Sequence, residues 1–276
     1  MAPLTITTLQ TNLAWENKNA NLQLLGKKIN GLQEKTEIVV LPEMFSTGFS
    51  MQPKLFAETM DGETVQWMKE ISSSNKIILT GSLIIEENEQ FYTRLIWMLP
   101  NGEFGYYDKR HLFGLAQEDK YYTAGNKRLI ASVKGWKINL QVCYDLRFPV
   151  WARNRKIPIE KSMEEESPIS PDARPEFDVL LYVANWPERR SHAWKTLLCA
   201  RAIENQCYVI GVNRVGVDGN NVSHSGNSLV IDPLGEVLYH MADEEDIFTI
   251  TLQKEWLNDV RKKFPFWKDA DDFNFR

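Results

Sequence analysis

Short apolar runs of the kind that form buried strands recur along the sequence, and many follow one another with no helix between them. Residues 37–43 (EIVVLPE) and 177–187 (FDVLLYVANWP) are the clearest, since continuous apolar runs are typical of strands buried on both faces. A purely alternating parallel sheet would place a helix after each such strand. We therefore predict two sheets packed face to face with helices outside them, a four-layer α-β-β-α sandwich of the α/β class, forming a single domain over residues 1–276.

Apolar residues at helical spacing predict the helices of this sandwich, at about residues 15–33, 62–73, 189–205 and 253–264. Strong turn signals predict two β-hairpins, one at Asn101-Gly102 and one at residues 233–235 (Pro-Leu-Gly). The short segment at residues 150–155 (VWARNR) is interpreted as helical.

A change of composition marks residues 156–175, which contain four prolines, several acidic residues and few apolar ones. Such a segment cannot build a core of its own, so we predict an exposed excursion. It is not a domain boundary, because strands are predicted on both sides of it. An aromatic and acidic tail follows the last predicted helix at about residues 265–276.

Charge and composition exclude several classes of function. The net charge is −5 with no basic stripe, so we expect no nucleic-acid partner. No apolar run is long enough to span a bilayer, and the first residues do not resemble a signal peptide. Three cysteines without paired spacing and four scattered histidines predict neither a disulfide framework nor a metal site. We expect a cytoplasmic protein with no cofactor.

Three chemically capable side chains each follow a predicted strand. Residues 138–142 alternate between apolar and polar as in a half-buried strand, and the alternation stops at Cys143. A thiol at the end of a buried strand can be held rigidly while it faces a cleft, as nucleophiles are. Glu43 follows the strand of the EIVVLPE run, and Lys109 follows the second strand of the first hairpin.

These groups suffice for amide hydrolysis through a thioester. Cys143 would attack the amide carbon, and Glu43 would carry the thiol proton to the leaving amine and later activate water. Lys109 would lower the pKa of the thiol and, with the backbone N–H of Tyr144, stabilise the oxyanion. Glu118, nine residues after Lys109, could orient the lysine or the substrate.

Each of these residues also has a structural interpretation. A lone cysteine such as Cys143 is most often a small buried hydrophobe, as we expect for Cys199 and Cys207. A glutamate after a proline is usually solvated, and Glu118 lies in a polar run typical of a surface. The chemical interpretation therefore depends on the combination of residues.

The combination resembles a known family. LPEMFSTGF, DKRHLF and CYDLRFP occur in the order of the glutamate, lysine and cysteine motifs of the nitrilase, or carbon–nitrogen hydrolase, superfamily. YVANWP, ARAIENQCYVIGVNRVG and NSLVIDPLGE are similar to further segments of that family, so the resemblance covers nearly the whole chain. Within the superfamily, QVCYDLRFPVWARN and KFPFWKDADDF most resemble the bacterial omega-amidases.

This resemblance implies an α-β-β-α sandwich that dimerises, with Glu43 as general base, Lys109 as catalytic lysine and Cys143 as nucleophile. It implies that Glu118 is an additional cleft glutamate, although the local motif is looser. It also implies a small-molecule substrate, the distal amide of 2-oxoglutaramate or 2-oxosuccinamate. The chain departs from the family at residues 156–175, where only a short connection is expected.

A carboxylate-bearing substrate needs a cation in the cleft besides Lys109. Arg110, Lys120 and Arg147 are candidates, although Arg147 is interpreted first as a structural residue that pairs with an internal acid. Aromatic residues that could pack the carbon chain of the substrate are Phe113, Tyr121, Tyr122 and Trp186. Trp186 is interpreted equally well as a packing residue.

Two other functions remain open on the sequence alone. The protein could be a non-catalytic binding member of the same fold, although the presence of all three motif residues speaks against this. It could also belong to another branch of the superfamily, such as aliphatic amidases, carbamoylases or nitrilases, which share the chemistry and differ in the pocket.

Overall fold

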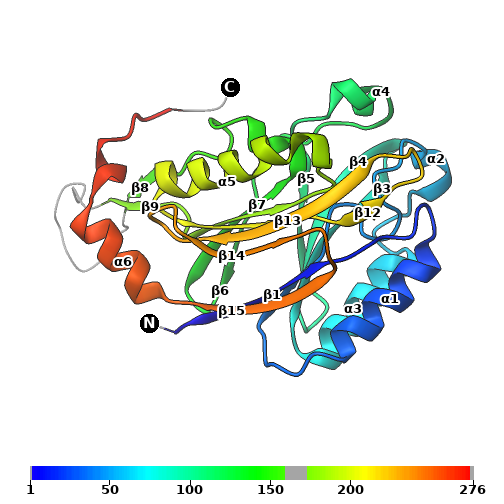
Figure 1. Cartoon of the computed structure of the whole chain (residues 1–276), viewed down its shortest axis with the longest axis horizontal. Helices are drawn as coiled ribbons and strands as arrows, with labels where there is room; N and C mark the ends of the chain where they lie inside the picture. Colours follow the sequence, from blue (N-terminus) through cyan, green and yellow to red (C-terminus); the bar gives the residue numbers. More distant parts are fainter. Residues whose placement is uncertain (1, 159–172, 274–276) are drawn as a thin grey trace.

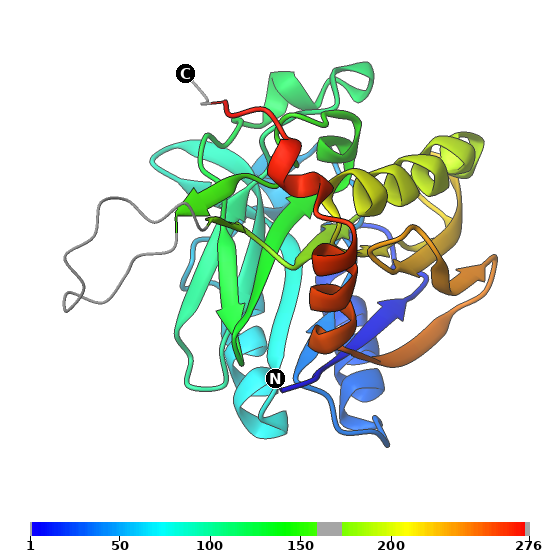
Figure 2. The ribbon, with the colours of Figure 1, turned by 90° about the vertical axis from the view of Figure 1, so that its left-hand side faces the viewer.

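The computed structural model describes residues 2–158 and 173–273 and is built on two large sheets packed face to face (Figures 1 and 2). The first sheet has six strands, in the order β15 (Asp246–Leu252), β1 (Leu4–Gln10), β2 (Ile38–Val40), β3 (Ile78–Glu87), β4 (Gln90–Met98) and β5 (Phe104–Asp108). The second has seven, in the order β12 (Val215–Val217), β13 (Ser223–Ile231), β11 (Tyr208–Val212), β10 (Val179–Val183), β7 (Trp136–Val142) and β6 (Ile130–Val133), with β14 (Val237–Ala242) paired to β13.

Helices cover the outer faces of both sheets, which confirms the predicted four-layer sandwich. Helices α1 (Lys18–Asn30) and α3 (Glu63–Asn75) pack side by side on the first sheet, and α5 (Ser191–Asn205) packs on the second (Figure 1). Helix α6 (Lys254–Lys263) follows β15. Shorter helical segments are α2 (Pro53–Phe56), α4 (Glu118–Tyr121), and the 3-10 turns η1 (Gly114–Ala116), η2 (Cys143–Arg147), η3 (Glu188–Arg190) and η4 (Phe266–Asp269).

The period of two along β2 shows how one strand serves two core layers. Ile38 and Val40 belong to the cluster that contains Ile138 and Leu140 of β7, between the two sheets. Val39 belongs to a second cluster with residues of α1 and α3, outside the first sheet. All of these side chains are buried, which explains why the β2 sequence is continuously apolar instead of alternating.

Local signals explain where the elements begin and end. The Asn17 side chain accepts a hydrogen bond from the backbone N–H of Ala20 at 3.1 Å, so α1 begins at Lys18 and not at residue 15. Both predicted hairpins are present: Gly102 joins β4 to β5 and Gly235 joins β13 to β14. Their φ angles are +84° and +92°, a region of backbone space that favours glycine.

The predicted helix at residues 150–155 is wrong. This segment forms turns that are fixed by tertiary contacts, in which Trp151 and Ala152 are buried and Asn154 bonds to the backbone at Phe177 and to Asn205. A run of six residues is too short for helix propensity to compete with such contacts.

The excursion predicted at residues 156–175 is described only at its two ends. These form a short antiparallel ladder between β8 (Lys156–Pro158) and β9 (Ala173–Pro175), and residues 159–172 lie outside the described part of the chain. The predicted tail is described as far as residue 273 and begins with η4.

Parallel pairing brings several strand ends to one edge of the sandwich. Strands β1, β2 and β3 are parallel neighbours in the first sheet, and β7, β10 and β11 are parallel neighbours in the second. The carboxyl ends of parallel strands meet at the same edge, which is where α/β proteins form their sites. Glu43 follows β2, Cys143 follows β7 and Asn185 follows β10 at this edge.

Candidate active site

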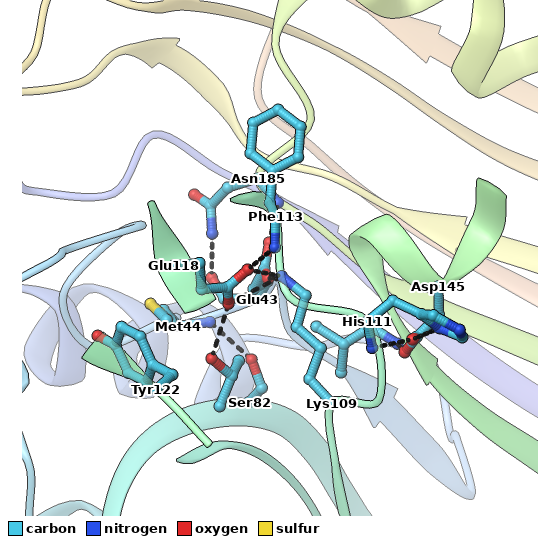
Figure 3. A network of polar contacts seen from close by, with 12 residues as sticks. Glu43, Met44, Ser82, Lys109, His111, Phe113, Glu118, Tyr122, Asp145 and Asn185 are labelled. Atoms are coloured by element: carbon cyan, nitrogen blue, oxygen red, sulfur yellow. Dashed lines mark hydrogen bonds and ion pairs between the residues drawn. The ribbon is translucent and has the colours of Figure 1, made fainter. Parts of the chain in front are cut away.

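Two residues of the predicted triad form a buried ion pair at this edge. The Lys109 Nζ donates a hydrogen bond to Glu43 Oε1 at 2.8 Å, and neither side chain is exposed to solvent (Figure 3). Lys109 follows β5, two strands away from β3 in the same sheet. The antiparallel pairings of β3 with β4 and of β4 with β5 give β5 the direction of β3, which brings Lys109 to the edge where Glu43 lies.

Glu118 completes this cluster from the other side of the lysine. Both of its carboxylate oxygens accept hydrogen bonds from Lys109 Nζ, at 3.0 and 2.9 Å (Figure 3). Glu118 Oε2 also accepts the backbone N–H of Phe113 at 2.6 Å, and Oε1 accepts the hydroxyl of Thr93 at 3.2 Å. Its side chain is fully buried, although its place in a polar run is typical of an exposed residue.

Two carboxylates keep the lysine charged. Burial disfavours the ammonium, but the charges of Glu118 and Glu43 outweigh this effect and raise the pKa of Lys109 well above its ordinary value. Burial also raises the pKa of Glu118, partly offset by the charge of Lys109. The cluster thus places a permanent cation beside the carboxylate of Glu43.

Cys143 lies at a sharp bend between β7 and η2. Its φ angle is +44°, in the left-handed region that residues with a side chain seldom adopt. A strained bend of this kind between a strand and a helical turn holds a nucleophile at the surface of a cleft. The residue is buried, with 9% of its surface exposed, and it contributes to the lining of a cavity.

The thiol is protonated at rest. Burial and then the charge of Glu43 raise the pKa of Cys143 well above its ordinary value, and the opposing effect of Lys109 is smaller. The lysine therefore acts in the predicted direction without producing a free thiolate. An attack by this sulfur needs a base, and Glu43 is the carboxylate whose charge acts most strongly on the thiol.

A second buried network holds the bend at Cys143. Asp145 Oδ2 accepts the backbone N–H of Val142 at 3.0 Å and the hydroxyl of Tyr107 at 2.7 Å. Its Oδ1 accepts the backbone N–H and the Nδ1 of His111, at 3.0 and 2.8 Å (Figure 3). Asp145 thus links the residues just before Cys143 to the segment just after Lys109.

Asn185, which we did not predict as a site residue, holds Glu43 in place across the two sheets. Its backbone N–H donates to Glu43 Oε2 at 2.8 Å, and its side-chain amide donates to the Glu43 carbonyl at 2.5 Å. The carboxylate of Glu43 thus has one oxygen on Lys109 and the other on Asn185. The signal for Asn185 was its place at the end of the YVANWP strand, the same signal that identified the other three.

A cavity of about 400 Å³ opens above these groups, within the size range of small-molecule sites. Among the predicted residues, it is lined by Lys109, Phe113, Cys143, Tyr144, Arg147 and Trp186. The Phe113 and Tyr144 rings meet edge to face at 4.9 Å between centroids, and the Arg147 guanidinium lies 5.1 Å from the Trp186 ring. Trp186 is therefore both a packing residue and a wall of the cavity.

The structure does not bring Tyr121, Arg110 or Lys120 into this lining. Tyr121 is 47% exposed. Glu118 at the start of α4 and Tyr122 just after it are buried instead, and the Tyr122 hydroxyl donates a hydrogen bond to the Ser50 carbonyl at 2.6 Å. The Arg110 guanidinium donates to the Gly125 carbonyl at 3.1 Å, and Lys120 contacts Gln117 on the surface.

Sequence reasoning also missed lining residues that come from loops, from η3 and from the start of β13. These are mainly Phe49, Met51, Arg189, Arg190, Asp218 and His224. Arg189 and Arg190 fall in η3, so the helix predicted from residue 189 begins two residues later, at Ser191. Their doublet after the YVANWP strand end was the available signal.

The described residues give no indication of a bound metal or a membrane span. Within residues 2–158 and 173–273, no three His, Cys, Asp or Glu side chains are grouped so that they could hold a metal ion. In the same part of the chain, no helix combines the length and apolar character needed to cross a bilayer.

Comparison with known proteins identifies the family. The sequence model of the carbon–nitrogen hydrolases matches residues 5–159 and 166–262. The chain belongs to the carbon–nitrogen hydrolase family. Residues 160–165, which the family model leaves unmatched, fall within the segment where the chain was expected to depart from the family.

Several carbon–nitrogen hydrolases are similar over nearly their full lengths. The omega-amidase YafV of Escherichia coli K12 is 40% identical, with 99% of each chain covered, and the 2-oxoglutaramate amidase of Bacillus subtilis is 30% identical, with 96% of each covered. A crystal structure of XC1258 from Xanthomonas campestris, a CN-hydrolase superfamily protein with an arsenic adduct in its active site, is 41% identical, covers 100% of both chains and superposes with a TM-score of 0.92. This carbon–nitrogen hydrolase is accordingly a hydrolase that acts on amide bonds.

Proposed function

We propose that this protein is an omega-amidase, which hydrolyses the distal amide of a small carboxylate-bearing ω-amide to the acid and ammonia through a thioester on Cys143. The observation that carries the proposal is the cluster of Glu43, Lys109 and Glu118 beside the strained bend of Cys143. The similarity to YafV and to the 2-oxoglutaramate amidase supports 2-oxoglutaramate or 2-oxosuccinamate as substrate.

In the first half of the reaction, Cys143 Sγ forms a bond to the amide carbon as Glu43 takes the thiol proton. The carbonyl π electrons move to the oxygen, and the ammonium of Lys109 and the backbone N–H of Tyr144 stabilise the resulting oxyanion. The C–N bond then breaks, and the nitrogen leaves as ammonia with the proton from Glu43. A protonated resting thiol suits this scheme, because the proton that activates the leaving group comes from Cys143 itself.

In the second half, Glu43 takes a proton from water as the water oxygen attacks the thioester carbon. The C–S bond breaks, the sulfur regains a proton and the carboxylic acid is released. Glu118 takes no proton in this scheme. It holds the Lys109 ammonium through two hydrogen bonds, while Glu43, which accepts one hydrogen bond from the same ammonium, exchanges the protons.

The test is ammonia release from a panel that contains 2-oxoglutaramate, 2-oxosuccinamate, glutamine, pentanamide and pentanenitrile. We expect the two oxo acids to have the highest kcat/KM. We expect Cys143→Ala to abolish turnover with the fold intact, and Glu43→Gln to slow it by about 10²–10⁴-fold. Mass spectrometry of a trapped adduct should locate it on Cys143.

Other results would assign the protein differently. Equal kcat/KM for pentanamide or the nitrile would move it to another branch of the family. An adduct on Cys199 or Cys207 would refute the nucleophile assignment, with Cys207→Ala as the matched control because this thiol is also buried. No ammonia from any substrate would favour a non-catalytic member.

We also propose that the protein is a single catalytic domain that forms a homodimer in the cytoplasm and needs no cofactor. The support is the resemblance to the family and the reducing environment that three free cysteines suit. Light scattering after gel filtration tests the dimer, and activity after dialysis against a chelator tests the cofactor.

A further inference from the structure

Three arginines line the mouth of the cavity above Cys143. Arg189 and Arg190 come from η3, and Arg147 comes from the end of η2. In the part of the chain that the structure describes, none of the three forms an ion pair with a carboxylate. Most other interior arginines are paired: Arg94 is bound by Asp108, and Arg261 by Asp178.

Among the described residues, the lining contains one carboxylate, that of Asp218. Asp218 Oδ1 accepts the backbone N–H groups of Asn220 and Val222, at 2.8 and 3.0 Å. These bonds hold the carboxylate in place but leave its negative charge. Three guanidinium groups outnumber this one carboxylate, so the cavity mouth has a net positive charge. An unneutralised cationic cleft concentrates anionic ligands.

Arg190 is the best placed of the three to contact a ligand. It is half-buried, whereas Arg147 and Arg189 are exposed. Its guanidinium lies 4.9 Å from the ring centre of Phe113, whose backbone N–H is bound by Glu118. Its backbone is also fixed, because its carbonyl accepts the Trp186 Nε1–H at 2.8 Å. Stacking and a fixed backbone reduce the entropy that a guanidinium loses when it binds.

We infer that Arg190 binds the carboxylate of the substrate and is the residue that makes this site select ω-amides, with Arg147 and Arg189 attracting the anion to the mouth. This inference rests on the proposed function. A substrate whose carboxylate lies on Arg190 directs its far end toward Cys143, so the distal amide is the bond cleaved. The ammonium of glutamine would then lie among three guanidinium groups, which explains why an oxo acid should be preferred.

The electrostatics of the guanidinium agree with this role. Burial and the charge of Arg189 lower the pKa of Arg190, as expected for a cation that has no carboxylate partner. A guanidinium nevertheless stays protonated at any physiological pH. A bound carboxylate would relieve this repulsion, and a neutral amide would not.

The test measures anion binding separately from turnover. 2-Oxoglutarate, which carries the same carboxylate as the proposed substrate, should protect Cys143 from alkylation by iodoacetamide. In Arg190→Gln, we expect the concentration needed for protection to rise by about 30–300-fold, in the range found when one partner of a charge pair is removed. Arg190→Lys should recover part of the affinity, and Lys120→Gln, which removes a nearby surface cation outside the cavity, should match the wild type.

The same variants are then assayed on two amides. Arg190→Gln should lose kcat/KM for 2-oxoglutaramate by a similar factor, mostly through KM, while kcat/KM for pentanamide changes less than about threefold. An unchanged protection constant and an unchanged preference for the oxo acid in Arg190→Gln would overturn the inference. If 2-oxoglutarate protects the wild type but not Arg190→Gln, and no amide is hydrolysed, the proposed function is refuted while the assignment of the anion site to Arg190 stands.

Discussion

His224 should make this protein lose stability in mild acid. The residue is 5% exposed on β13 and lines the cavity, and its Nδ1 donates to the Val222 carbonyl at 3.0 Å. Burial and then the charge of Arg214 lower the pKa of His224 from 6.5 to about 4, against smaller opposing effects of Asp218 and two backbone groups. The neutral ring is therefore strongly preferred in the folded state.

The size and sign of the effect follow from this pKa. Between pH 6.5 and 4 the unfolded chain binds a proton at His224 that the folded protein does not, so stability falls as the pH falls through this window. A lowering from 6.5 to about 4 corresponds to about 3 kcal/mol, at ~1.36 kcal/mol for each pKa unit. Above pH 6.5 the full stability is present.

The variant His224→Asn isolates this contribution, because an asparagine amide can still donate to the Val222 carbonyl but does not titrate. Urea unfolding of both proteins at pH 7.5, 6.5, 5.5 and 4.5, at one fixed protein concentration, gives the difference in unfolding free energy at each pH. We expect this difference to shift in favour of the variant by about 2–3 kcal/mol between pH 7.5 and 4.5. His192→Asn, at an exposed histidine of α5, is the matched control. A difference that stays constant across the range would refute the argument.

Two further predictions concern the buried networks. Glu118→Gln keeps an acceptor for the Phe113 N–H but leaves Lys109 with one carboxylate, so we expect kcat to fall on the order of 10²-fold with the fold preserved, measured by steady-state kinetics and circular dichroism. Asp145→Ala leaves the buried donors of Val142 and Tyr107 without their acceptor, and we expect at least ~2 kcal/mol loss of unfolding free energy and slower alkylation of Cys143. Unchanged alkylation in a destabilised Asp145→Ala protein would show that the bend does not depend on this carboxylate.

The sequence predicted the parts of this site that depend on strand ends. Glu43, Lys109 and Cys143 each follow a predicted strand, and the directions of these strands bring the three positions to a common edge. Asn185 obeys the same rule and could have been predicted by it. The sandwich itself could be predicted because strands outnumber helices and their burial is encoded in local periodicity.

The other residues of the cavity lie in or beside loops, and local sequence patterns do not determine the paths of loops. Arg190 lies in η3 after β10 and His224 at the start of β13, and no periodicity of the sequence indicates that both line the cavity. Arg110 and Lys120 were nearer to the motifs in sequence, yet their side chains point elsewhere. The helix expected at residues 150–155 failed for a related reason, because tertiary hydrogen bonds replaced the local ones.

The origin of the candidate catalytic groups has a consequence for how activity should disappear. Glu43 and Lys109 belong to one sheet, and Cys143 to the other, so the reactive arrangement exists only while the two sheets are docked in one register. Asn185 spans this junction through two hydrogen bonds to Glu43. A displacement of one sheet by an ångström would leave both sheets hydrogen-bonded and yet separate the thiol from its base. Turnover thus depends on how the two sheets are docked. During partial denaturation, catalytic activity should be lost before circular dichroism shows any loss of strands.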